Sequence, residues 1–293
     1  MNGPRFAGTG VAVVTPFQAD GTVDLPSLTK ILEHLIDGQV NYLVMLGTTG
    51  ESATLDHKEK QQIFSHTCRI TAGRLPLVAG IGGNDTSRVL EDIQGFDLTG
   101  YSAILSVSPY YNKPSQEGIY RHYQAVAAAS PLPVILYNVP GRTSMNMTAD
   151  TTLRIARDCP NVIGTKEASG NLDQIMRILR GKPEGFEVIS GDDAITLPMI
   201  ALGATGVISV IGNAYPKIFS DMVRKCLAGN FHAARPDHFR LLEAVDTLFA
   251  EGSPSGIKAY MHEMGLCENQ FRLPVVPVSD TLYSSICGIM AHL

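Results

Sequence analysis

The chain has 293 residues, of which 44% are hydrophobic and 17% are charged, and its formal net charge is −5. This composition is sufficient for one or two packed globular domains. It argues against a nucleic-acid partner or an anionic membrane partner, because such surfaces are bound by clustered lysine and arginine and the chain has no basic surplus.

The first apolar segment of the chain, "MNGPRFAGTGVAVVTPF", is interrupted by Pro4, Gly8 and Gly10. We therefore expect no signal peptide and no spanning helix there, and we expect a cytoplasmic protein. The five cysteines are odd in number and widely scattered, without a CxxC pair. They indicate neither a disulfide framework nor a zinc site, and we expect no metal.

Short β-branched runs alternate along the chain with longer segments in which apolar residues recur at helical spacing. Asp24 is the expected N-cap of a helix over residues 25–36, and Asp56 with Glu59 predicts a capping box for a helix over 57–70. The short runs predict strands that are buried on both faces. These runs are residues 10–14, 42–46, 76–80, 103–107, 133–137, 161–165, 186–190 and 206–210.

Eight strand–helix units of this kind predict an α/β fold, a closed (β/α)8 TIM barrel over residues 1–224, for which about 250 residues is typical. The strand signal then fades, and helical patterns predict a small C-terminal helical extension over residues 225–293. An open doubly wound sheet is the alternative. Against it, no G-x-G-x-x-G motif follows the first run.

Active sites of (β/α)8 barrels lie at the carboxyl ends of the strands. Polar residues that end or follow the predicted strands are therefore candidates for the site. They are Thr15, Thr48, Thr49, Tyr110, Tyr111, Tyr137, Asn138, Lys166, Asp192, Asp193 and Ser209.

Lys166, in "GTKEASGN", is the most informative of these candidates. A lysine amine with an ordinary pKa near ~10.4 is a poor nucleophile at neutral pH, but burial in an apolar barrel mouth favours the neutral amine, which can attack a carbonyl. The alternative is a structural lysine that pairs with Glu167, Asp192 or Asp193, or that extends to the barrel rim. The pattern alone leaves both interpretations open.

Tyr137 ends the fifth run as Lys166 follows the sixth, so adjacent strands would bring the two side chains within reach. A phenol in that place could carry protons during catalysis, although a lone tyrosine is more often a core residue. The turn "GTTGES" at 47–52 lacks the spacing of a P-loop, which argues against nucleotide binding. Its backbone N–H groups and hydroxyls could instead bind a small carboxylate.

Six motifs together resemble the pyruvate-dependent class I aldolase and lyase superfamily, and most closely its dihydrodipicolinate synthase family. They are "GTTGES", "SPYYNKPSQEGIY", "YNVPGRT", "GTKEASGN", "SGDD" and "GVISV", in the order of that family. The resemblance extends from about residue 6 to about residue 279. It implies a homotetrameric (β/α)8 lyase, a dimer of dimers, that condenses pyruvate with L-aspartate 4-semialdehyde in lysine and diaminopimelate biosynthesis.

The resemblance also implies roles for individual residues. Lys166 is expected to form a Schiff base with pyruvate, so that no cofactor and no metal is needed. Tyr137 is expected to donate and accept protons, relayed through Thr48 and through Tyr111 of a neighbouring subunit.

The remaining implied contacts concern the two substrates. Thr49, Ile208 and Gly191 are expected around pyruvate, and Arg142 is expected to bind the carboxylate of the semialdehyde, which suits a planar guanidinium. Sialate and sugar-acid lyases share the lysine and the tyrosine, so a lyase of that type is the alternative prediction for the function. We expect them to differ after "YN-x-P", where this chain has "GRT".

Relatives that are inhibited by lysine have an effector site at a subunit interface. The matching residues here are Ser52, Ala53, His57, Lys60, Asn84, Arg88 and Tyr110. Sensitive relatives have histidine in place of Lys60 and an acidic residue in place of Arg88. Because two added cations repel a cationic effector, we expect weak or absent inhibition by lysine.

Two further classes of function stay open on the sequence. A metal-dependent aldolase on the same barrel would lose activity with a chelator and form no covalent adduct. A non-catalytic binding barrel would bind ligand without turnover, which the combination of Lys166, Tyr137 and Thr48 disfavours.

Overall fold

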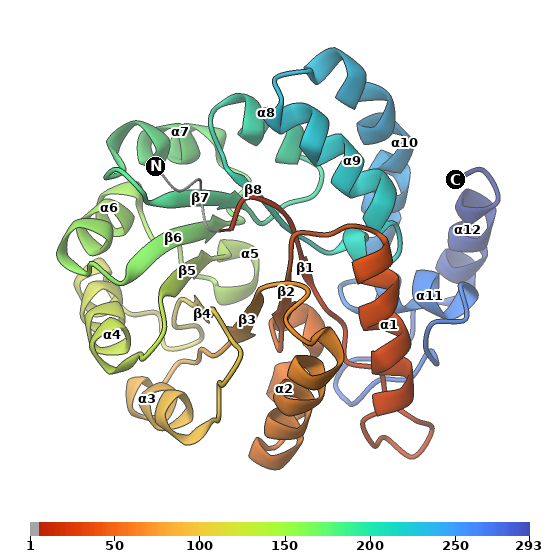
Figure 1. Cartoon of the computed structure of the whole chain (residues 1–293), viewed down its shortest axis with the longest axis horizontal. Helices are drawn as coiled ribbons and strands as arrows, with labels where there is room; N and C mark the ends of the chain where they lie inside the picture. Colours follow the sequence, from red (N-terminus) through yellow and green to blue (C-terminus); the bar gives the residue numbers. More distant parts are fainter. Residues whose placement is uncertain (1–5) are drawn as a thin grey trace.

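The computed structural model describes residues 6–293, so Pro4 and the other residues of the first five lie outside it. In the described residues eight strands close in chain order into one parallel barrel, in which β8 pairs with β1 (Figure 1). The strands are β1 (Gly8–Ala12), β2 (Tyr42–Met45), β3 (Leu77–Gly80), β4 (Ala103–Val107), β5 (Val134–Asn138), β6 (Val162–Glu167), β7 (Glu187–Ser190) and β8 (Gly206–Ser209). The predicted closed barrel is confirmed, and the open doubly wound sheet is wrong.

The first strand begins two residues earlier than predicted, at Gly8 instead of Gly10. A Cβ atom on Gly10 would lie 2.1 Å from the ring of Tyr42, which fills the barrel interior beside β1. Glycine is therefore required at a position where sequence propensity disfavours a strand. The later part of the predicted run, including Val13 and Val14, is buried but lies beyond the end of β1.

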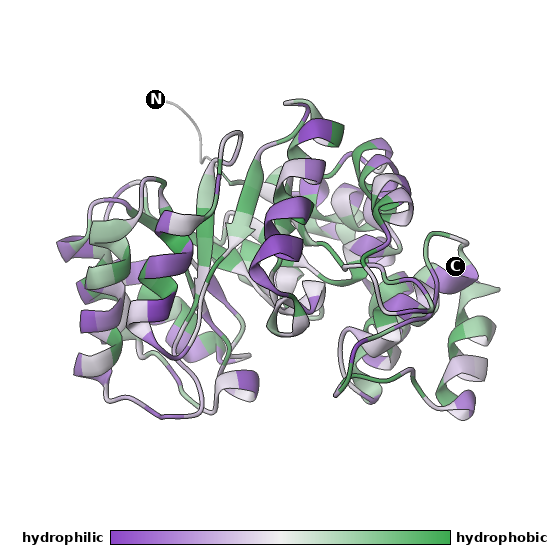
Figure 2. Ribbon diagram, turned by 90° about the horizontal axis from the view of Figure 1, so that it is seen from below, coloured by the Kyte–Doolittle hydropathy of each residue, from purple (hydrophilic) through white to green (hydrophobic). Residues whose placement is uncertain are grey.

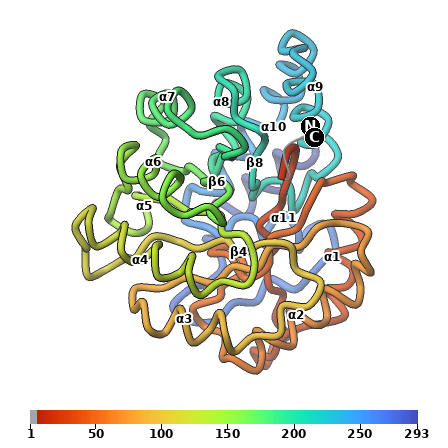
Figure 3. Tube along the Cα trace, turned by 60° about the vertical axis from the view of Figure 1, so that its left-hand side comes forward, coloured from red at the N-terminus to blue at the C-terminus, as the bar shows by residue number. Residues whose placement is uncertain are grey.

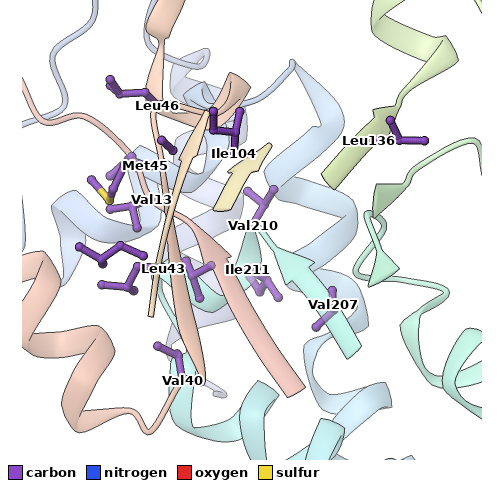
Figure 4. Packing of buried hydrophobic residues seen from close by; sticks show 14 of the residues in the cluster. Val13, Val40, Leu43, Met45, Leu46, Ile104, Leu136, Val207, Val210 and Ile211 are labelled. Carbon is purple, nitrogen blue, oxygen red and sulfur yellow. The ribbon is translucent and has the colours of Figure 1, made fainter. Parts of the chain in front are cut away.

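Alternate residues of each strand belong to two separate apolar clusters, as expected for strands that are buried on both faces. Val44, Ile135 and Ile208 fill the barrel interior. Leu43 and Leu136 belong to the larger cluster between strands and helices, part of which is drawn in Figure 4. Figure 2 shows the apolar strands in the middle and hydrophilic positions on the outer helices.

Helices cover the outside of the barrel (Figure 1). They are α1 (Leu25–Asp37), α2 (His57–Thr71), α3 (Thr86–Gly95), α4 (Gln116–Ala129), α6 (Ala149–Asp158), α7 (Leu172–Gly181), α8 (Thr196–Ala201) and α9 (Pro216–Leu227). The short helix α5 (Pro140–Thr143) directly follows β5 and lies inside this ring (Figure 1). Both predicted caps are confirmed: Asp24 accepts a hydrogen bond from the Ser27 N–H, and Asp56 forms a capping box with Glu59. Short 3-10 turns η1 (Thr48–Gly50), η2 (Ser52–Thr54) and η3 (Ile211–Asn213) follow strands β2 and β8.

The C-terminal helical extension consists of α10 (Phe231–Ala250), α11 (Ser255–Glu263) and α12 (Asp280–Met290). In Figure 3 the chain can be followed from α8 and α9 into this blue segment, part of which runs behind the strands. The predicted boundary between residues 224 and 225 falls inside α9, and the division into two domains stays a prediction. Within residues 6–293, no helix has both the length and the apolar character needed to cross a membrane.

Candidate active site

Lys166 and Tyr137 are neighbours at the carboxyl ends of β6 and β5. The strand register pairs them directly, and both side chains are buried, with 4% and 6% of their surface exposed. The Lys166 Nζ atom lies 4.3 Å from the centre of the Tyr137 ring. The structure therefore brings together the amine and the phenol that the sequence singled out.

The side-chain amine of Lys166 has no ion pair and no hydrogen bond to any residue that the structure describes. The three carboxylates proposed as its structural partners are held elsewhere. Glu167 accepts hydrogen bonds from side-chain amides, and Asp192 and Asp193 accept them from backbone N–H groups. The interpretation of Lys166 as an ion-paired or rim-extended lysine is therefore not supported by its geometry.

Glu167 lies at the centre of a buried network of neutral donors. Its carboxylate accepts hydrogen bonds from the Asn138 side-chain amide at 3.0 Å, from the Ser169 N–H at 3.0 Å and from the Gln174 amide at 3.3 Å. Burial is the main reason why the pKa of Glu167 lies above its ordinary value. Because Asn138 and Glu167 follow Tyr137 and Lys166 directly in the strands, the network fixes the ends of β5 and β6.

Gly191 and Ile208 complete the surroundings of Lys166. A Cβ atom on Gly191 would lie 3.0 Å from Cε of Lys166 and 2.7 Å from Cβ of Ala168, so glycine leaves the room that the lysine stem occupies. Ile208 is buried on the inner face of β8, in the same cluster as Tyr137. Both residues were expected around pyruvate.

The turn after β2 presents Thr48 and Thr49 from η1. Thr48 is exposed and Thr49 is buried. Thr48 and Tyr137 both line a small cavity of about 70 Å³. Thr15, another candidate, donates a hydrogen bond from Oγ1 to the Gly50 carbonyl at 2.6 Å, so it supports this turn.

Arg142 lies on the wall of a larger cavity of about 760 Å³, which Thr48 also lines. Its guanidinium is exposed and donates one hydrogen bond, at 3.3 Å, to the Ser253 carbonyl of the C-terminal extension. Tyr111 is 87% exposed and has a left-handed backbone with φ of 70°. Tyr111 is therefore not part of the buried group around Lys166 in its own chain.

The expected effector residues mostly gather at this larger cavity. Six of the seven line it: Ser52, Ala53, His57, Lys60, Arg88 and Tyr110. Asn84 is not among the lining residues, and its carbonyl accepts a hydrogen bond from the Asn112 side chain. The guanidinium of Arg88 lies 3.1 Å from Glu91, in a pair that is well exposed.

Three candidates at strand ends have local structural partners instead. Asp193 is buried and accepts hydrogen bonds from the Val210 and Ile211 N–H groups, which fixes the start of η3. Ser209 accepts a hydrogen bond from the Gly212 N–H, and Asp192 caps the turn that follows it. These residues shape the loops that follow β7 and β8.

Sequence reasoning missed Lys258 and Glu51, which form a completely buried ion pair. Lys258 lies on α11 between residues that are also buried, among them Ile257 and Ala259. A lysine inside a fully buried helical segment was the available signal, because such a charge requires a partner.

The family model of the dihydrodipicolinate synthetase family matches residues 5–292 of the chain. The 4-hydroxy-tetrahydrodipicolinate synthase of Flavobacterium psychrophilum is 54% identical over 94% of each chain. The enzyme of the same name from Parabacteroides distasonis is 51% identical, over 99% of this chain and 97% of the relative.

Solved structures agree with these relatives. A crystal structure of the dihydrodipicolinate synthase of Acinetobacter baumannii, described as chloride inhibited and complexed with pyruvate, has a TM-score of 0.95 to this chain. It is 37% identical and covers 98% of both chains. The similarity therefore includes the strands that carry Lys166 and Tyr137 as well as the C-terminal helices.

Proposed function

The chain belongs to the dihydrodipicolinate synthetase family and condenses pyruvate with L-aspartate 4-semialdehyde, and we propose that Lys166 performs this reaction by forming a Schiff base with pyruvate. The observation that supports this role is a buried lysine amine without a carboxylate partner, beside the ring of Tyr137. A related enzyme that has been crystallised with pyruvate agrees with the proposal.

The chemistry begins with attack of the Lys166 amine on the ketone carbon of pyruvate, and the ketone oxygen leaves as water. The protonated imine then accepts electrons as a methyl proton is lost, which gives an enamine. The enamine carbon attacks the aldehyde carbon of the semialdehyde. The amino group of the second substrate finally displaces the lysine by transimination, which closes the ring, so enzymes of this family need no cofactor.

Tyr137 is the proposed proton donor and acceptor for these steps, with Thr48 as its relay. In support, both residues line the same small cavity, and the Tyr137 ring lies next to the reacting amine. A positioned phenol within reach of the reacting atoms is suited to general acid–base catalysis. Thr49, Ile208 and Gly191 are proposed to surround pyruvate.

Arg142 is proposed to bind the carboxylate of the semialdehyde. The exposed guanidinium lies on the wall of the larger cavity and uses only one weak hydrogen bond to Ser253, which leaves most of its donors free. A planar guanidinium binds a carboxylate through two parallel hydrogen bonds.

A homo-oligomer, and within it a tetramer built from two dimers, is part of the proposal. Tyr111 is almost fully exposed in a strained backbone conformation, which is the state expected of a side chain that inserts into a neighbouring subunit. We also propose that the enzyme works in the cytoplasm, and its five free cysteines fit a reducing compartment.

Covalent trapping tests the proposed role of Lys166. The enzyme is incubated with pyruvate and borohydride and its intact mass is measured, for the wild type, for Lys166→Ala and for Lys182→Ala as a control lysine. We expect one reduced adduct on the wild type and on the control, and none on Lys166→Ala. An adduct that persists in Lys166→Ala would show that another amine forms the imine.

Weak or absent inhibition by lysine remains a prediction for this enzyme. Lys60 and Arg88 add two cations to the cavity where the effector residues gather, and a cationic amino acid is repelled there. A steady-state assay with added lysine checks this, with Arg88→Glu as the variant expected to gain sensitivity. Half-maximal inhibition of the wild type by submillimolar lysine would contradict the prediction.

A further inference from the structure

The turn that carries Thr48 and Thr49 has an unusual backbone. Two 3-10 turns, η1 and η2, are separated by Glu51, which adopts a left-handed conformation with φ of 51° and ψ of 35°. A residue with a long side chain rarely adopts this conformation unless surrounding contacts impose it. The shape of the turn therefore depends on what holds Glu51.

The partner of Glu51 comes from the C-terminal extension. Its carboxylate Oε1 lies 2.5 Å from Nζ of Lys258, and both side chains are essentially inaccessible to solvent. Lys258 donates a second hydrogen bond to the Gln270 carbonyl at 3.0 Å. The rings of Phe17 and Phe271 lie 4.5 and 4.6 Å from the same amine. Lys258 is thus enclosed on several sides and directed at one carboxylate.

Arg272 strengthens the same connection on the far side of the turn. Its guanidinium donates to the Thr54 carbonyl at 2.8 Å, to the Gly21 carbonyl at 2.7 Å and to the carboxylate of Glu59. The C-terminal segment therefore contacts the turn at Glu51 and again three residues later. A turn held at two points has little freedom to move.

This contact lies beside the larger cavity, on whose wall Arg142 also lies. Thr48 and Glu51 line the larger cavity from the barrel, and Pro254 and Pro274 line it from the C-terminal extension. The extension is consequently part of the wall of this cavity, and Lys258 of α11 contacts the turn directly through Glu51.

We propose that Lys258 is a positioning residue for the reaction: through its ion pair with Glu51 it fixes the turn that presents Thr49 to pyruvate and Thr48 to Tyr137. The inference rests on the proposed function, which assigns Thr49 to pyruvate and makes Thr48 the relay of Tyr137. Lys258 itself does not touch substrate. It couples the C-terminal extension to the geometry of the barrel mouth.

The first variant is Lys258→Met, which keeps the stem and removes the charge. We expect the KM for pyruvate to rise about tenfold or more, since small displacements of binding groups have effects of that order. The KM for the aldehyde substrate should change less than about twofold, because Arg142 lies on α5 and its contact with the extension is one long hydrogen bond, at 3.3 Å, to the Ser253 carbonyl. A purely structural role predicts no such difference between the two substrates.

A double variant separates the effect of Lys258 on the position of the turn from its effect on the stability of the fold. Lys258→Met alone leaves the Glu51 carboxylate buried without a counterion, although it keeps the Arg272 backbone N–H as a donor at 3.5 Å, whereas Glu51→Met with Lys258→Met removes both charges. We expect the melting temperature of the double variant to return toward that of the wild type while the pyruvate KM stays raised. Recovery of both quantities would overturn the inference, since the pair would then act only through stability.

A milder substitution covers the case in which these variants fold poorly. Glu51→Gln keeps the size and the acceptor oxygen of the side chain but removes its charge, and a raised pyruvate KM is again expected. An unchanged pyruvate KM in this folded variant overturns the inference. As a matched control, Lys225→Met breaks the half-buried pair with Asp237 between α9 and α10 and should leave both KM values unchanged.

Pyruvate and borohydride trapping on the same proteins distinguishes the two proposals. An adduct at Lys166 in the wild type, together with an unchanged pyruvate KM in the Lys258 and Glu51 variants, overturns the positioning role alone. Absence of an adduct in the wild type overturns the proposed function and the positioning role with it.

Discussion

Two lysines are buried near the mouth of the barrel, and their surroundings differ in almost every respect. Lys258 on α11 is paired with Glu51, donates to the Gln270 carbonyl and lies near two aromatic rings. Among the residues that the structure describes, the amine of Lys166 on β6 has one contact of this kind, with the ring of Tyr137. A lysine that must attack a carbonyl needs a free amine, whereas a lysine that must hold a loop needs a partner.

The nearest carboxylates explain how this difference is maintained. Glu167 follows Lys166 in the chain, but successive residues of a strand point to opposite faces, and the amides of Asn138 and Gln174 hold its carboxylate on the far side. At Lys258, burial is the largest influence and lowers the pKa of the amine, and the nearby Glu51 carboxylate opposes that effect. Neutral amide donors thus bind the buried carboxylate of Glu167, whereas the Lys258 cation binds that of Glu51.

The same substitution at both lysines should separate these roles most strongly. Lys166→Met should reduce kcat/KM by about 10³-fold or more, because the imine cannot form, yet change the free energy of unfolding by less than about 1 kcal/mol. Lys258→Met should instead cost about 3–5 kcal/mol, because it leaves the Glu51 carboxylate buried without a counterion.

Denaturant unfolding and steady-state kinetics on the two variants check this contrast. Lys225→Met serves as the control for loss of a lysine from a more exposed pair. Equal losses of stability at Lys166 and Lys258 would show that Lys166 also has a stabilising partner, and the comparison would fail.

The sequence was sufficient to predict where Lys166 lies in the fold, but not to predict where Lys258 lies or what it contacts. Apolar runs predict all eight strands, and strand order then places Lys166 beside Tyr137, because neighbouring parallel strands end at the same edge. Lys258 has no such signal, since its partner is 207 residues away in the chain and only the folded extension brings them together.

Position at a strand end was also not sufficient to identify the residues of the active site. It selected Asp193 and Ser209, whose polar atoms in fact bind nearby backbone N–H groups. A strand end exposes backbone donors that need acceptors, and short polar side chains such as these can meet that need instead of binding a substrate. Pattern alone could not separate these two uses.

A smaller effect is expected from crowding the free lysine. Gly191→Ala adds a Cβ atom that would lie 2.7 Å from Cβ of Ala168, where something must shift, and 3.0 Å from the Lys166 stem, which it crowds. We expect kcat/KM to fall about tenfold and the rate of borohydride trapping to fall with it. Gly288→Ala, where an added Cβ meets no atom within 4 Å, is the matched control. Unchanged trapping in Gly191→Ala would mean that Lys166 tolerates the displacement.

The smallest predicted effect concerns the pH dependence of the ion pair between Arg272 and Glu59. Two hydrogen bonds from Arg272 are the main reason why the pKa of Glu59 lies below its ordinary value of 4.5. The pair therefore stabilises the fold fully above pH 4.5 and loses that contribution as the pH falls through the lower folded pKa.

Glu59→Gln isolates the charge in this pair, because glutamine can still complete the capping box with Asp56. We expect the variant to be about 1–2 kcal/mol less stable than the wild type at pH 7, and the difference to shrink as unfolding is measured at successively lower pH below 4.5. Glu33→Gln, which breaks a more exposed pair with Arg74, should show a smaller difference. A difference that does not change with pH would mean that the carboxylate charge contributes nothing, and that Arg272 holds the turn only through its contacts with backbone carbonyls.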